Sequence, residues 1–123
     1  MLWPQSNLDQ GQYNAAREKF EKAMEVMQQI GDRAGEAATF YQLSFLAKKQ
    51  CREQEGLRVL ALCFLIDASI GDGKTQNDFK ALLGIASELN YKQEQIDAML
   101  KDVAEAYERD RGKGLIEAAF GKG

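Results

Sequence analysis

Histidine is absent from the 123-residue chain, and proline occurs only once, at Pro4. Without histidine, the chain lacks the commonest general base, the commonest metal ligand and every Ser–His or Cys–His catalytic pair. With a single proline, residues 5–123 are free of the strongest helix breaker. We therefore expect an all-α protein that is not an enzyme, needs no cofactor and acts by binding.

The chain also lacks the features that mark nucleic-acid-binding and membrane proteins. Its net charge is −3, whereas proteins that bind nucleic acid usually carry a basic face. The longest strongly apolar stretch, residues 57–66, is shorter than the roughly 20 residues that a bilayer span needs. Residues 1–10 lack the basic start and apolar run of a signal peptide. We expect a cytoplasmic protein with no nucleic-acid and no membrane partner.

Cysteine is scarce as well, with only Cys51 and Cys63. Two cysteines are too few for a disulfide framework, which suits a reducing compartment. A zinc site needs four closely arranged ligands, and neither cysteine has a histidine or a second cysteine near it in the sequence. We expect no metal site, no catalytic thiol, and a core position for Cys63.

What the sequence does contain is helical periodicity. Apolar residues recur at spacings of three and four, the pattern of one buried face of a helix. The pattern predicts helices over residues 14–30, 35–49, 52–69, 76–89, 92–109 and 114–120. The third of these is apolar on most sides and is expected to be the most buried. We find no alternating pattern of the kind that predicts a strand.

The sequence also repeats itself. The tripeptide Ile30-Gly31-Asp32 returns as Ile70-Gly71-Asp72, and each copy ends an apolar helix. The small–large pair Ala16 and Phe20 returns as Gly56 and Leu60 at the same offset. A fixed period of about 40 residues is typical of stacked helical hairpins, in which small residues let neighbouring helices approach closely.

These residues resemble the tetratricopeptide repeat family, whose helical hairpin follows the pattern W-x2-L-G-x2-Y and then A-x3-F. Phe40-x2-Leu43-Ser44-x2-Ala47 resembles its first helix, and the segment from Gly11 to Ala23 resembles its turn and second helix. The unit is longer than the usual one of this family and is similar to the repeats of kinesin light chains and bacterial signalling proteins. The resemblance implies a right-handed stack of antiparallel hairpins that acts as a protein-interaction scaffold.

On this interpretation residues 1–123 form one domain of about two to three repeats. Residues 1–32 are a truncated first repeat, 33–72 a full repeat, 73–110 a degenerate repeat and 111–123 a C-terminal capping segment. Because the first repeat lacks its leading helix, we expect the chain to be a fragment of a longer repeat protein. We also expect the uncovered stripe of Phe20, Met24 and Met27 to drive self-association into a homo-oligomer, since large apolar patches usually mark interfaces.

The resemblance further implies a concave face that holds a protein or peptide partner, lined by residues of the first helix of each hairpin. The matching positions are Tyr41, Gln42, Phe45, Lys48 and Lys49, followed by Lys80, Ala81, Gly84 and Ser87. Aromatic side chains beside lysines suit an extended or acidic segment, with apolar anchors and electrostatic steering.

Two alternatives stay open. Residues 68–75, Ala-Ser-Ile-Gly-Asp-Gly-Lys-Thr, fit a relaxed phosphate-binding loop in which Lys74 contacts phosphates and Thr75 holds Mg²⁺. The competing interpretation of this segment is a turn between helices, because the same Ile-Gly-Asp tripeptide already ends a helix at residues 30–32. The second alternative is a purely structural oligomerisation segment with no outside ligand.

Overall fold

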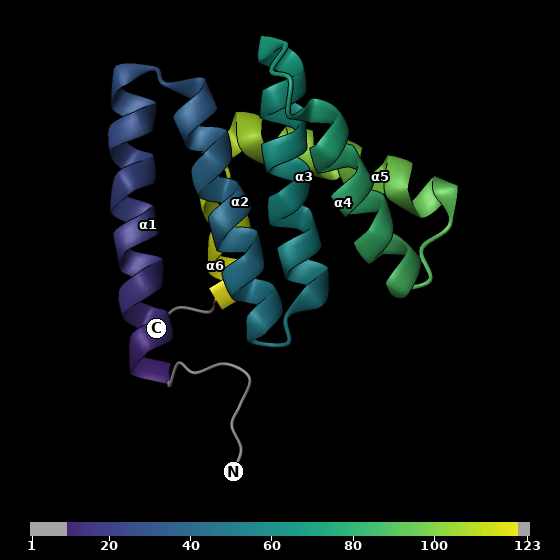
Figure 1. Cartoon of the computed structure of the whole chain (residues 1–123), viewed down its shortest axis with the longest axis horizontal. Coiled ribbons are helices and arrows are strands. Elements are labelled where there is room, and N and C mark those ends of the chain that lie inside the picture. Colours follow the sequence, from purple (N-terminus) through teal and green to yellow (C-terminus); the bar gives the residue numbers. More distant parts are fainter. Residues whose placement is uncertain (1–9, 121–123) are drawn as a thin grey trace.

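The computed structural model describes residues 10–120, which form six helices (Figure 1). Their bounds are α1 Gln10–Ile30, α2 Arg33–Lys49, α3 Glu53–Ile70, α4 Thr75–Glu88, α5 Gln93–Asp110 and α6 Lys113–Phe120. Each predicted helix is present, with ends a few residues from those expected. The prediction of an all-α fold of five to six helices is confirmed, and no strand occurs within residues 10–120.

The repeated tripeptide makes the same turn twice. Gly31 and Gly71 both adopt the left-handed backbone conformation, with φ of 77° and 71°, which glycine adopts without steric cost. In the first copy the Asp32 N–H donates to the Met27 carbonyl at 2.8 Å, and in the second the Asp72 N–H donates to the Asp67 carbonyl at 2.9 Å. These bonds satisfy carbonyls that a helix end would otherwise leave unpaired, so each tripeptide stops its helix.

Helix α3 is the centre of the fold, as its apolar sequence predicts. It packs against α2, α4, α5 and α6. Its apolar side chains from Leu57 to Ile66 supply much of the core, together with Phe40 and Leu43 of α2. In Figure 1, α1, α2 and α3 lie side by side as antiparallel neighbours, and α4 lies on the other side of α3.

Helices α2 and α3 approach closely at Gly56. A Cβ atom added to Gly56 would lie 3.0 Å from the Ser44 carbonyl oxygen and 3.4 Å from the Ala47 Cβ. The nearest neighbour is backbone, which cannot swing aside as a flexible side chain would. Small residues at these positions therefore allow the close contact between α2 and α3.

Alanine substitutions at two helical glycines should have opposite effects. In Gly84→Ala the new Cβ enters open space, so we expect the free energy of unfolding to rise by about 0.5–1 kcal/mol, the usual helix-propensity gain. In Gly56→Ala the crowding against Ser44 removes that gain, and we expect a loss of about 1–2 kcal/mol. Urea unfolding of both variants measures the difference, and equal gains in stability would show that the contact at Gly56 is not tight.

The C-terminal helices return to the first half of the chain instead of continuing outward. Helix α5 packs against α3 and α6, and α6 packs against α3. In Figure 1, α6 lies behind α2, and α5 passes behind α4 and α3. Arg52, just before α3, donates to the Ala118 carbonyl of α6 at 3.3 Å. Gln28 of α1 donates to the Arg111 carbonyl at 3.4 Å. Residues from the two ends of the described range are thus brought into contact.

A buried carboxylate joins α5 to the first hairpin. Glu36 of α2 is almost completely buried and accepts hydrogen bonds from the Tyr107 hydroxyl at 2.8 and 3.0 Å and from the Gln28 amide at 2.8 Å. Arg111 and Arg33 lie 3.9 and 4.0 Å from the same carboxylate. Burial, together with the neighbouring Glu36, raises the pKa of Tyr107 above its ordinary value. Glu36 therefore links α1, α2 and α5.

The predicted stripe for self-association is not an exposed patch. Met24 is buried in the core, and Phe20 and Met27 are half-buried, because α1 packs against α2. Met24 also faces a hollow of about 440 Å³ that α1 shares with Arg111 and α6. The exposed large apolar side chains of α1 are Val26 and Ile30 instead. Self-association itself stays a prediction.

None of the helices within residues 10–120 is both long enough and apolar enough to span a bilayer. The division into one truncated, one full and one degenerate repeat stays a prediction, and its first nine and last three residues lie outside the described range.

Candidate functional site: a groove between α2 and α4

Two adjoining hollows lie between α2 and α4, above α3, and Tyr41 lines both of them. We call them together the α2–α4 groove. The first, the aromatic hollow, has a volume of about 250 Å³. It is lined by Tyr41, Ser44, Phe45, Lys48, Leu60, Ala81, Gly84, Ile85 and Glu88. The groove therefore has a floor from α3 and walls from the two helices that precede and follow α3 in the sequence.

Phe45 is the main apolar feature of the aromatic hollow. Its side chain is 45% exposed and packs edge-on against the Tyr41 ring, with centroids 5.0 Å apart. Opposite it, Gly84 has open space where a side chain would stand. Lys48 and Glu88 add one charge of each sign. An exposed aromatic beside a recess is the arrangement that anchors a partner side chain.

The second hollow, the acidic hollow, has a volume of about 260 Å³. It is lined by Ala38, Tyr41, Gln42, Cys63, Asp67, Lys74, Asn77 and Asp78. Asp67 and Cys63 come from one face of α3, four residues apart, and Asp78 comes from the first turn of α4. The turn at residues 71–74 folds α4 back against α3 and so brings Asp78 to the other two.

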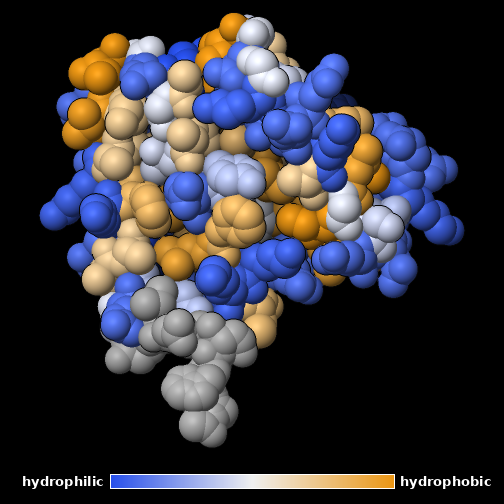
Figure 2. Space-filling model, in the orientation of Figure 1, coloured by the Kyte–Doolittle hydropathy of each residue, from blue (hydrophilic) through white to orange (hydrophobic). Residues whose placement is uncertain are grey.

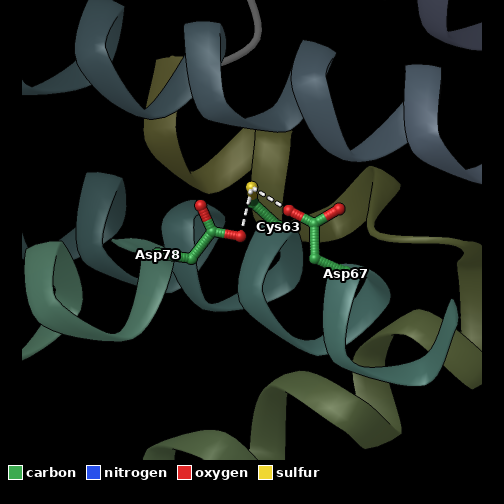
Figure 3. A group of neighbouring side chains, drawn as sticks. All are labelled: Cys63, Asp67 and Asp78. Atoms are coloured by element: carbon green, nitrogen blue, oxygen red, sulfur yellow. Dashed lines mark hydrogen bonds between the residues drawn. The ribbon is translucent and has the colours of Figure 1, made fainter. Parts of the chain in front are cut away.

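These three side chains form a buried cluster at the floor of the acidic hollow (Figure 3). The Cys63 thiol lies 3.7 Å from Asp67 Oδ2 and 3.6 Å from Asp78 Oδ2, within hydrogen-bonding range for sulfur. Asp67 Oδ1 is buried and has no hydrogen-bond partner. Burying polar groups is costly unless they are paired, so the cluster is an unusual feature of the most apolar helix.

The cluster shifts the pKa values of its members. Burial, the hydrogen bond with Asp67 and the negative charge of Asp67 raise the pKa of Asp78 to about 7, against the smaller opposing effects of the Cys63 thiol and the Lys74 ammonium. Burial and the two carboxylates raise the pKa of the Cys63 thiol far above its ordinary value. The thiol is therefore held protonated and is not an activated nucleophile.

The structure brings together some of the residues predicted for the concave face and leaves others apart. Tyr41, Phe45 and Lys48 line the aromatic hollow with Ala81 and Gly84, and Gln42 lines the acidic hollow. Three further predicted residues are exposed but line neither hollow, namely Lys49, Lys80 and Ser87.

Residues 68–75 form a turn between two helices. Gly71 caps α3, the Lys74 N–H donates to Asp72 Oδ1 at 2.8 Å, and the Thr75 hydroxyl donates to the Asp72 carbonyl at 2.7 Å. A phosphate-binding loop instead connects a strand to a helix and leaves its N–H groups free for phosphate. Here the Lys74 N–H and the Thr75 hydroxyl are already used within the turn.

Reasoning from the sequence missed Asp67 and Asp78. It considered only cysteine and histidine as metal ligands and assigned no role to these two aspartates. One signal was present: Asp67 lies four residues after Cys63, on the same face of the helix expected to be most buried. The contact of Cys63 and Asp67 with Asp78 depends on the geometry of the turn between α3 and α4, and no local sequence pattern predicts it.

Comparison of the chain with family models, with curated proteins and with solved structures finds no match. The resemblance to tetratricopeptide repeats therefore stays a prediction.

Proposed function

We propose that the chain is a non-enzymatic protein-interaction module that binds an extended segment of a partner protein in the α2–α4 groove. The observation that carries the proposal is the aromatic hollow, in which exposed Phe45 and half-buried Tyr41 line the recess beside Gly84. The tetratricopeptide resemblance, a place within a longer scaffold protein and action in the cytoplasm belong to the same proposal. Two free thiols are consistent with a reducing compartment.

The shape and chemistry of the groove support an extended segment over a small molecule. The two hollows adjoin at Tyr41, so their occupant would run along the groove and place one side chain in each. Figure 2 shows this face of the molecule, where apolar and hydrophilic residues alternate instead of forming one large apolar patch. Mixed surfaces of this kind bind through a few anchors surrounded by polar contacts.

The test is a selection of peptides from a random displayed library on the folded chain, followed by affinity measurements on variants. Gly84→Leu fills the recess from a position with open space, so it should block the groove without disturbing the fold. We expect Gly84→Leu and Phe45→Ala each to weaken selected peptides by at least about tenfold, the loss of one anchor. Fluorescence anisotropy with labelled peptides measures this.

Phe79→Ala is the matched control. Phe79 is 37% exposed, close to the value for Phe45, but it pairs with Phe64 and lines neither hollow. We expect its affinity for peptides to equal that of the unmodified chain. Peptides that bind Gly84→Leu as tightly as the unmodified chain would contradict the proposal.

Each alternative function predicts a different result. A nucleotide-binding unit predicts ATP binding that is lost in Lys74→Ala. A purely structural oligomerisation segment predicts no selected peptide and an oligomeric state that the double variant Tyr41→Ala, Phe45→Ala leaves unchanged. Equilibrium dialysis with ATP and sedimentation of the double variant distinguish these outcomes from peptide binding.

A further inference from the structure

The buried cluster of Cys63, Asp67 and Asp78 has the composition of a metal site. One sulfur and two carboxylate oxygens lie within 4.8 Å of one another, and the three residues are 2%, 1% and 5% exposed. They come from two helices that the cluster ties together, α3 and α4. A thiolate with two carboxylates is a donor set that Zn²⁺ accepts.

The two sulfur–oxygen distances of the cluster match the coordination shell of that ion. Metal–ligand distances of about 2.3 Å to sulfur and about 2.0–2.2 Å to oxygen, at a tetrahedral angle, place sulfur and oxygen about 3.5–3.7 Å apart. The distances from Cys63 Sγ to the two carboxylates are 3.7 and 3.6 Å. Both sulfur–oxygen distances therefore fit a shared zinc ion, and the two carboxylate oxygens lie within 4.8 Å of each other.

An independent observation points to a missing cation. Asp67 Oδ1 is buried and accepts no hydrogen bond, so this carboxylate has unused capacity. In Figure 3 it is the oxygen on the side of the carboxylate away from Cys63, while the other oxygen, Oδ2, faces the thiol. None of the ion pairs formed among residues 10–120 involves Asp67 or Asp78. Lys74 lines the same hollow but forms no ion pair with either carboxylate. When both carboxylates are charged they repel each other at a buried site, and a bound metal ion would offset that repulsion.

We propose that Cys63, Asp67 and Asp78 bind one divalent ion of the zinc class. Binding forms one metal–sulfur bond and a metal–oxygen bond to each carboxylate. The thiol proton passes to solvent, and so does the carboxyl proton of any Asp78 that is still protonated. The ion sheds hydration water but keeps one water as its fourth ligand, on the side of the acidic hollow. The thiolate selects Zn²⁺, Cd²⁺ and Co²⁺ over Mg²⁺ and Ca²⁺, which prefer oxygen ligands alone. The ion links α3 to α4.

Cobalt binding provides the direct test. The chain must be used without a polyhistidine tag, because the histidines of the tag would themselves bind cobalt. The chain has no histidine of its own, so the untagged protein offers no competing imidazole ligand. Titration with Co²⁺ should give one equivalent of a tetrahedral complex with a thiolate-to-cobalt charge-transfer band. Zinc at about a hundredfold excess over its Kd should raise Tm by roughly 5–10 °C, and magnesium should not.

Two cysteine variants assign the band. Cys63→Ser should abolish it, whereas Cys51→Ser, which changes the exposed cysteine, should leave it intact. Asp78→Asn keeps the side-chain shape and should weaken cobalt binding by at least about tenfold, the usual cost of a lost ligand-shell group. This variant also decides the question if Cys63→Ser fails to fold.

An unmodified chain without the charge-transfer band, a band that follows Cys51, or full cobalt affinity in Asp78→Asn would each overturn the proposal. The metal site and the peptide groove can fail separately. Gly84→Leu should block peptides and leave the cobalt spectrum unchanged, because Gly84 lines only the aromatic hollow.

Discussion

Replacing Glu36 with alanine is expected to lower the free energy of unfolding by about 2–4 kcal/mol. The change removes the acceptor of the Tyr107 hydroxyl and of the Gln28 amide. Because Glu36 is almost completely buried, it also leaves a cavity. The arginines contribute less, since Arg111 and Arg33 are about half exposed and can be hydrated. Urea unfolding followed by circular dichroism measures the loss.

Three further variants separate the causes. Glu36→Gln keeps an acceptor for Tyr107 and should cost less, about 1–2 kcal/mol, and Tyr107→Phe should cost about the same. Glu108→Ala, an exposed change one position along α5, should change stability by less than about 0.5 kcal/mol. If Glu36→Ala and Tyr107→Phe were strictly additive, α5 would not be held to α2 through this hydrogen bond.

As the pH rises from about 4 to 7, the free energy of unfolding of the metal-free chain is expected to fall. The fall should exceed that of the Asp78→Asn variant by about 2–4 kcal/mol. The pKa of Asp78 is raised from 3.8 to about 7, so in this window the folded chain holds a proton that the unfolded chain has released. Raising the pH removes that proton and leaves two buried carboxylates charged side by side. The contribution is fully present below the unfolded pKa and is lost as pH rises through 7.

The groups that face Asp78 are the Cys63 thiol and Asp67 from α3, the Lys74 ammonium from the preceding turn, and the neutral Gln42 and Tyr41 from α2. Asp78→Asn keeps the shape but carries no titrating proton, so its profile should be flatter and it should be the more stable protein at pH 8. Denaturant unfolding at several pH values in the presence of a chelator tests this. Parallel profiles for the two proteins would show that Asp78 titrates normally.

The helices were predictable because their information is local. The spacing of apolar residues predicted all six helices. The repeated Ile-Gly-Asp tripeptide predicted two turns, which share one backbone conformation at Gly31 and Gly71. The small residue at Gly56 likewise predicted a close approach of helices, which occurs against Ser44. Part of the groove came from the tetratricopeptide resemblance instead, which singled out Tyr41, Phe45 and Lys48 on one face of a single helix; all three line the aromatic hollow.

The remaining features depend on contacts between distant residues. The hydrogen bond between Glu36 and Tyr107 spans 71 positions, and no local pattern marks it. The packing of α1 against α2 buries Met24, so the expected exposed stripe is absent. Asp67 and Asp78 meet only because the turn at residues 71–74 reverses the chain between them. Charged residues in such places are mistaken for surface residues when only the sequence is considered.

The most direct measurement of the central claim is an amide chemical-shift map of the isotope-labelled chain with a selected peptide. We expect the largest shifts in α2 around Tyr41 and Phe45 and in α4 around Gly84, with little change at Val26 and Ile30 of α1. Shifts confined to α1, with the residues of the α2–α4 groove unchanged, would contradict the account and assign partner binding to another surface.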